Sequence, residues 1–180
     1  KIIGLISPHA GYVFSGQTAG EAFKQIEGKN FDTVILVGSS HKYPVKGAAV
    51  WTGGSFSTPL GEIAIDDELT EKLLCETSKI IQSNNNVHIP EHSLEVQLPF
   101  LQKVLKNFKI AAILINDTQY YGEVAKIIAK VISGSKKSIL LVASTDMTHY
   151  PEKKHAETVD KDILKTIEKF DTETLIKADE

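Results

Sequence analysis

The chain has 180 residues, of which 42% are apolar and 24% are charged, as in an ordinary globular domain of this size. Its formal net charge is −3, and all 20 of its basic residues are lysines. The planar fork of arginine is the usual group for two-point binding of phosphate and guanine, so the sequence disfavours nucleic-acid and phosphopeptide binding.

No apolar run approaches the roughly 20 residues that a membrane-spanning helix needs, so we expect no membrane association. The single cysteine, Cys75, cannot form an internal disulfide, which favours a cytoplasmic location. Cys75 falls on an amphipathic helix pattern, where we expect a packed thiol rather than a metal ligand.

The first half of the chain alternates strand and helix patterns. Ile2–Ile6 and Thr33–Val37 are apolar runs, and the continuous β-branched character of the second is typical of a strand covered on both faces. Two shorter extended pieces, Ala48–Trp51 and Glu62–Ile65, are interpreted as a meander or edge pair outside the core. Apolar residues at helical spacing predict two helices, the second capped by Asp66 or Asp67: Ala19, Ala22, Phe23 and Ile26, then Leu69, Leu73 and Leu74.

The second half repeats this alternation. A helix pattern runs from Leu94 to Phe108, and Pro99 within it should bend or restart the helix. Strands interleaved with helices of this length predict an α/β fold, a layered sandwich with a mostly parallel central sheet flanked by helices. The remaining expected elements are the strands Lys109–Ile115 and Ser138–Ala143, a helix over Val124–Val131, a helix over Val159–Phe170, and a short turn capped by Asp171.

Side chains suited to metal binding or proton transfer follow three of the predicted strands. His9 and His41 come after the first two, and Asp146 and His149 come after the last. Because ligands bind beyond the carboxyl ends of strands in an open parallel sheet, these residues can converge there. Two histidines and a carboxylate suit non-haem Fe(II) with open coordination positions. We therefore predict metal ligation by His9, His41 and Asp146, with His149 as an acid–base group.

Each of these residues also has a structural interpretation. His9 can be an ordinary loop residue, His41 can belong to a tight turn held by serine side chains, and Asp146 can close an Asx turn. We interpret His88 and His155 as solvent-exposed residues without a role.

His92 lies at the start of the Leu94–Phe108 helix pattern, between Glu91 and Glu95. The two glutamates are typical first-turn acids, which interact favourably with a helix N-terminus. Alternatively, these residues ligate the metal directly, or His92 or Glu95 supports a metal-bound histidine through a hydrogen bond or contacts the substrate.

Four motifs follow one another over nearly the whole chain: Ser-Pro-His9-Ala-Gly-Tyr-Val-Phe-Ser-Gly, Gly-Ser-Ser-His41, Glu91-His92-Ser-Leu-Glu95-Val-Gln-Leu-Pro-Phe and Ser-Thr-Asp146-Met-Thr-His149. In this order they closely resemble those of the Memo family, which includes the microbial AmmeMemoRadiSam system protein B. The resemblance implies a single Memo-like α/β domain over residues 1–180, similar to the catalytic subunit of class III extradiol dioxygenases and truncated at the C-terminus relative to the family.

The same resemblance implies roles for single residues. His9 and His41 are similar to the family's metal-binding histidines, His92 to a pocket-lining histidine, and Asp146 and His149 to pocket residues beside them. In the Memo branch the third ligand is a cysteine in a later Cys-Gly segment, which this sequence does not contain. Either the chain is truncated before that segment, or Asp146 is the third ligand, or the site is incomplete.

Two functions of different classes are compatible with such a pocket. The first is a dioxygenase-like oxidoreductase that uses Fe(II) or Cu on a small aromatic substrate, with His149, Asp146 and His92 as its catalytic residues. The second is a non-catalytic pocket that binds a phosphotyrosine-type peptide or another partner. The resemblance also implies association with AMMECR1-like or radical SAM proteins.

Overall fold

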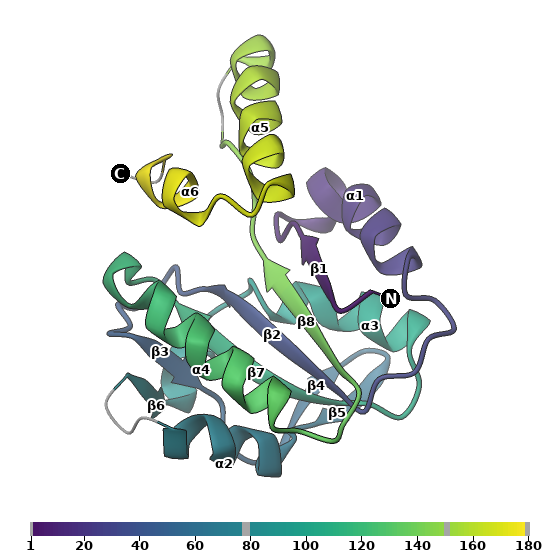
Figure 1. Cartoon of the computed structure of the whole chain (residues 1–180). Coiled ribbons are helices and arrows are strands. Elements are labelled where there is room, and N and C mark those ends of the chain that lie inside the picture. Colours follow the sequence, from purple (N-terminus) through teal and green to yellow (C-terminus); the bar gives the residue numbers. More distant parts are fainter. Residues whose placement is uncertain (1, 77–79, 150–151, 179–180) are drawn as a thin grey trace. The chain divides into compact units, whose positions relative to one another are not determined.

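A computed structural model describes residues 2–76, 80–149 and 152–178 (Figure 1). The chain divides after Thr145 into two compact units, and the prediction of a single domain stays a prediction. Among the described residues, no helix is both long and apolar enough to cross a membrane.

The first unit is built on a six-stranded sheet with the strand order β1-β8-β2-β7-β3-β6. Four of its neighbouring pairs are parallel, and the β3–β7 pair is antiparallel. The predicted α/β class with a mostly parallel sheet is therefore confirmed. The strands of this sheet are β1 (Gly4–Ser7), β2 (Thr33–Ser39), β3 (Ala48–Val50), β6 (Ile81–Ser83), β7 (Lys109–Ile115) and β8 (Ile139–Ser144).

Helices cover both faces of this sheet, α1 and α3 on one face and α2 and α4 on the other (Figure 1). Phe23 of α1 joins Val34 in one core cluster, whereas Leu73 of α2 joins Ile35 in the other. Successive β2 side chains alternate between two apolar layers, which explains the continuous apolar run. The helices of this unit are α1 (Tyr12–Lys24), α2 (Asp67–Glu76), α3 (Leu98–Val104) and α4 (Tyr121–Ser133).

The two short extended pieces differ from the prediction, because they do not pair with each other. β3 is fully buried inside the large sheet, between β7 and β6. The piece near Glu62 instead forms β5 (Gly61–Ala64), which pairs with β4 (Ser55–Thr58) in a separate hairpin. A three-residue strand such as β3 is too short to show a period in the sequence, so its partner could not be predicted.

Pro99 restarts a helix, as predicted. The 3₁₀ turn η2 (Glu95–Gln97) leads into α3, and Pro99 lies in the first turn of α3, where its missing N–H breaks no helical hydrogen bond. Two further 3₁₀ turns are η1 (Asn85–Val87) and η3 (Thr118–Tyr120). The cap at Asp66 is also confirmed, since its Oδ1 accepts the backbone N–H of Leu69 at 3.2 Å.

The second unit contains α5 (Lys153–Glu168) and α6 (Thr172–Ala178). Asp171 caps α6, because its Oδ1 accepts the backbone N–H of Thr174 at 3.1 Å. The capped segment is a short helix rather than the single turn expected from the sequence.

Candidate metal centre

His9 and His41 follow the carboxyl ends of two parallel strands, β1 and β2. β8 lies between these strands, and its Ser144 is level with Ser7 of β1 and with Gly38 of β2. The two loops therefore leave the sheet at the same edge, and the two imidazole rings lie side by side with their centroids 5.1 Å apart.

His92 completes a group of three imidazoles. Its ring centroid is 5.7 Å from that of His9 and 5.0 Å from that of His41. One nitrogen from each ring lies within 4.8 Å of the other two, and nitrogens around one ion with bonds of about 2.1 Å are about 3–4 Å apart. Small ring rotations would therefore let the three share an ion. His9 is buried, whereas His41 and His92 are exposed, so one side of the group is open.

Gly38 lets the segment that carries His92 lie directly on β2. A Cβ at this position would be 2.7 Å from Cδ2 of Leu94 and 2.9 Å from Oγ of Ser93, and both of these residues are buried. The Ser93 hydroxyl also donates a hydrogen bond to the carbonyl of Ser39 at 2.8 Å. This close approach brings His92 to His41. The sequence suggested a place for His92 in the pocket but not the part that Gly38 plays, although a glycine at a strand end was a signal for it.

Glu91 is a buried carboxylate that holds both exposed histidines. Its Oε1 lies 2.9 Å from Nδ1 of His41 and accepts the backbone N–H groups of His92 and Ser93, each at 2.9 Å, and its Oε2 accepts the backbone N–H of His41 at 2.6 Å. Nδ1 of His92 lies 3.3 Å from the same Oε1. Burial raises the pKa of Glu91, but the hydrogen bonds from His41 and Ser93 and the electrostatic interaction with His41 outweigh burial and lower the pKa to about 2.

The sequence favoured a helix-end role for Glu91 over direct ligation, and it offered His92 or Glu95 as the supporting residue. In the structure Glu95 is exposed at the start of η2. The missed signal was the position of Glu91, an acidic residue directly before the candidate ligand His92. From there its carboxylate contacts His41 on the loop after β2.

A separate set of hydrogen bonds holds His9. Its Nδ1 lies 3.1 Å from Oγ of Ser144, and that hydroxyl donates to the carbonyl of Ser93 at 2.5 Å. Nε2 of Gln97 donates to the same hydroxyl at 2.8 Å and to the carbonyl of Pro8 at 2.9 Å. These buried contacts link the loop after β1 to β8 and to the segment that carries His92.

Asp146 and His149 belong to the second unit. Their side chains form a pair, with His149 Nε2 3.5 Å from Asp146 Oδ2. Thr148, between them, bonds Asp160 of α5 through its backbone N–H at 3.1 Å and its hydroxyl at 2.9 Å. The roles of Asp146 as a ligand and His149 as an acid–base group stay predictions.

Two residues outside the group differ from their predicted surroundings. His88, expected to be exposed, is buried, and its Nε2 lies 3.2 Å from the carbonyl oxygen of Ala49. Burial lowers the pKa of His88 to about 4, so the ring is neutral at pH 7. Cys75, expected to be packed, is exposed.

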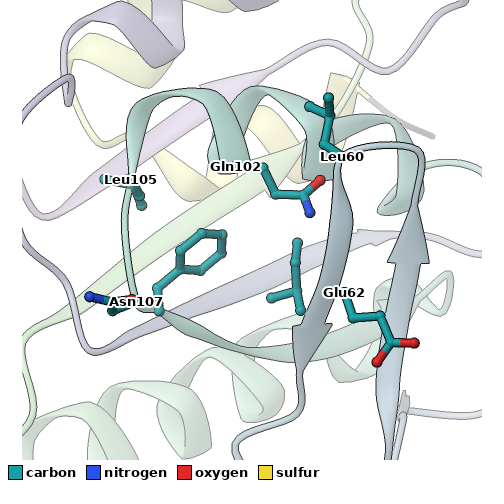
Figure 2. A pocket seen from close by; sticks show the side chains of 7 residues that line it. Leu60, Glu62, Gln102, Leu105 and Asn107 are labelled. Carbon is teal, nitrogen blue, oxygen red and sulfur yellow. The ribbon is translucent and has the colours of Figure 1, made fainter.

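None of the three histidines lines the cavity shown in Figure 2. It has a volume of about 280 Å³ and lies between the β4–β5 hairpin, α3 and the loop before β7, with Glu62, Gln102 and Asn107 in its lining. Asn107 precedes β7, so this cavity opens at the amino end of that strand, whereas the histidines lie at the carboxyl ends of β1 and β2.

Comparison with known proteins identifies the family. Residues 1–179 match the family model described as "Memo-like protein". A MEMO1 family protein of Nitrosopumilus maritimus is 38% identical over 175 residues, which cover 96% of this chain and 62% of the relative. Its counterparts in Sulfolobus acidocaldarius and Aquifex aeolicus are 38% and 37% identical over 96% and 95% of this chain and cover 62% and 63% of the relatives. The chain therefore spans less than two thirds of the length of these relatives, and over that length it belongs to the Memo family.

Proposed function

We propose that this protein is a metal-dependent oxidoreductase in which His9, His41 and His92 bind one Fe(II) or Cu ion. The convergence of the three imidazoles at one edge of the sheet is the observation that carries the proposal. Imidazole is a good ligand for Fe, Cu and Zn, so the donor set fits such an ion. The choice of a redox metal and of a small aromatic substrate follows the resemblance to class III extradiol dioxygenases, which is an analogy at the level of the fold.

A bound ion would supply Lewis-acid and redox chemistry at this edge of the sheet. The chain's own residues would bind this ion and orient the groups around it. The buried ring of His9 fixes the inner side of the site, while the exposed rings of His41 and His92 leave a side through which a small molecule can approach. In this proposal His149 exchanges a proton with the substrate, and Asp146, 3.5 Å from its Nε2, orients the His149 ring.

Asp146 is the alternative third ligand. It follows β8, the strand that lies between β1 and β2, and a carboxylate beside two histidines is a common non-haem iron set. Metal affinity separates the two candidates, because His92→Ala weakens binding if His92 ligates and Asp146→Asn weakens it if Asp146 does.

The proposal is tested by elemental analysis of untagged protein, purified without chelators and then reconstituted with Fe(II) under anaerobic conditions. We expect about one metal ion per chain in the wild type and none in the His9→Ala/His41→Ala double variant. Both histidines lie on loops, so the double variant should keep the circular-dichroism spectrum of the wild type. His155→Ala, at an exposed helix position, is the matched control and should keep its metal.

Metal loading in the wild type would justify measuring O₂ consumption with catechols. A folded wild type that stays metal-free after reconstitution would refute the proposal and leave ligand binding without redox chemistry as the remaining function. A double variant that retains its metal would show that the ion is held elsewhere.

A further inference from the structure

We propose that Glu91 and Ser144 are positioning residues that set the tautomers of His41 and His9, so that each ring carries its hydrogen on Nδ1 and has its lone pair on Nε2. The tautomers follow from hydrogen bonds within the chain, whereas their use in metal binding rests on the function proposed above. Glu91 and Ser144 act through the histidines.

For His41, the hydrogen-bond partners leave only one position for the ring hydrogen. Three backbone N–H groups, those of His41, His92 and Ser93, point at the Glu91 carboxylate and occupy both of its oxygens. A carboxyl group that receives donors on both oxygens acts only as an acceptor. Nδ1 of His41, 2.9 Å from Oε1, must therefore be the donor of that bond, which places the hydrogen on Nδ1.

For His9, the same conclusion follows from a hydroxyl. Ser144 has one hydrogen, and a carbonyl can only accept, so the 2.5 Å contact with the Ser93 carbonyl uses that hydrogen. The amide of Gln97 is oriented by the Pro8 carbonyl, 2.9 Å from Nε2, so Nε2 also donates to Ser144. The hydroxyl has no second hydrogen for Nδ1 of His9 at 3.1 Å, and Nδ1 must donate.

Two unrelated partners, a carboxylate and a hydroxyl, thus select the same tautomer in neighbouring rings. A neutral imidazole in water prefers its hydrogen on Nε2, so this agreement is not the intrinsic preference of the side chain. Metal-bound histidines usually donate their other N–H to a carboxylate, carbonyl or water, which fixes the ring and raises its basicity. Oε1 of Glu91 also lies 3.3 Å from Nδ1 of His92, so one carboxylate oxygen lies beside the Nδ1 atoms of two of the three proposed ligands.

The first test measures the tautomers directly in metal-free wild-type protein. Long-range ¹H–¹⁵N correlation spectra of histidine-labelled protein, recorded well above the ordinary histidine pKa of about 6.5, distinguish the two neutral forms. We expect Nδ1–H for His9 and His41, assigned with the single alanine variants. His88 is the control within the same spectrum, because its Nε2 faces the Ala49 carbonyl and it should show Nε2–H.

An Nε2–H or doubly protonated ring at His9 or His41 would overturn the inference for that residue. This outcome is measured in the metal-free wild type and does not depend on any metal.

The second test measures metal affinity by chelator competition. Glu91→Gln removes the charge and one acceptor oxygen and should weaken binding by about 10- to 100-fold, the usual effect of losing such a partner. Ser144→Ala should shift His9 towards Nε2–H and weaken binding less, because a hydroxyl raises ligand basicity less than a carboxylate does. Glu27→Gln makes the same chemical change at an exposed position after α1 and should bind as the wild type does.

Wild-type affinity in Glu91→Gln would overturn the positioning role. A wild type with both rings as Nδ1–H but without metal affinity would refute the proposed function and support the tautomer assignment, so the two failures are distinguishable.

Discussion

At the scale of single residues, four histidines of the first unit differ in their hydrogen-bond partners. His88 and His9 are both buried, but Nε2 of His88 lies beside a backbone carbonyl, whereas Nδ1 of His9 lies beside a serine hydroxyl. His41 and His92 are exposed and lie beside the carboxylate of Glu91. His88 is thus a neutral core residue, and the other three present a group of ring nitrogens to one point.

His88 should make the stability of the protein depend on pH. Its pKa is lowered from 6.5 to about 4 by burial, so the unfolded chain binds a proton more readily than the folded chain between these values. Stability should therefore fall as the pH decreases through this window, by up to about 3 kcal/mol from this residue. His88→Gln keeps a donor near the Ala49 carbonyl but does not titrate.

Urea unfolding at pH 7 and pH 4.5 measures this effect. The loss of stability between the two values should be smaller in His88→Gln than in the wild type, whereas the exposed His155→Gln control should behave as the wild type. Equal losses in all three proteins would show that His88 does not titrate as described.

At the scale of elements, the sequence predicted that loop histidines follow two strands, β1 and β2, because an apolar run followed by a histidine is a local pattern. It suggested that His92 lines the same pocket, but it did not predict the contact that holds the segment from Glu91 at that edge, since this contact joins residues about 50 positions apart. The contact depends on the absence of a side chain at Gly38 and on the hydrogen bond from Ser93 to Ser39. The burial of β3 was missed for a similar reason, because neighbours in the sheet are set by packing across the whole unit.

Gly38→Ala should separate His92 from His41. The added methyl group would lie within 3 Å of both Ser93 and Leu94, so the segment must move or the strand must strain. We expect a loss of about 1–3 kcal/mol in the free energy of unfolding, as for other overpacked sites, together with weaker metal binding.

Gly122→Ala is the control, because a Cβ at that position meets no heavy atom within 4 Å and an alanine in a helix should be neutral or slightly stabilising. Urea unfolding and chelator competition on both variants measure the two effects. A Gly38→Ala protein with wild-type stability and metal affinity would show that this close approach does not hold the site together.

At the scale of the whole molecule, alternating strand and helix patterns were sufficient to predict the layered α/β fold. A strand covered by helices on both faces is apolar throughout, as β2 is, and that pattern is visible without a structure. The third ligand of the proposed metal site was harder to predict, because it depends on which loops meet at the edge of the sheet. The sequence favoured Asp146, and the structure adds His92 as a candidate, since one of its ring nitrogens lies within 4.8 Å of a nitrogen of His9 and of one of His41.

In the proposed site three imidazoles share one ion, and electron paramagnetic resonance of the Cu(II)-loaded protein tests this arrangement by counting the coordinated nitrogens. We predict three imidazole nitrogens in the wild type, two in His92→Ala, and three in Asp146→Asn. An unchanged spectrum in His92→Ala, combined with altered coordination in Asp146→Asn, would contradict the claim and establish Asp146 as the third ligand.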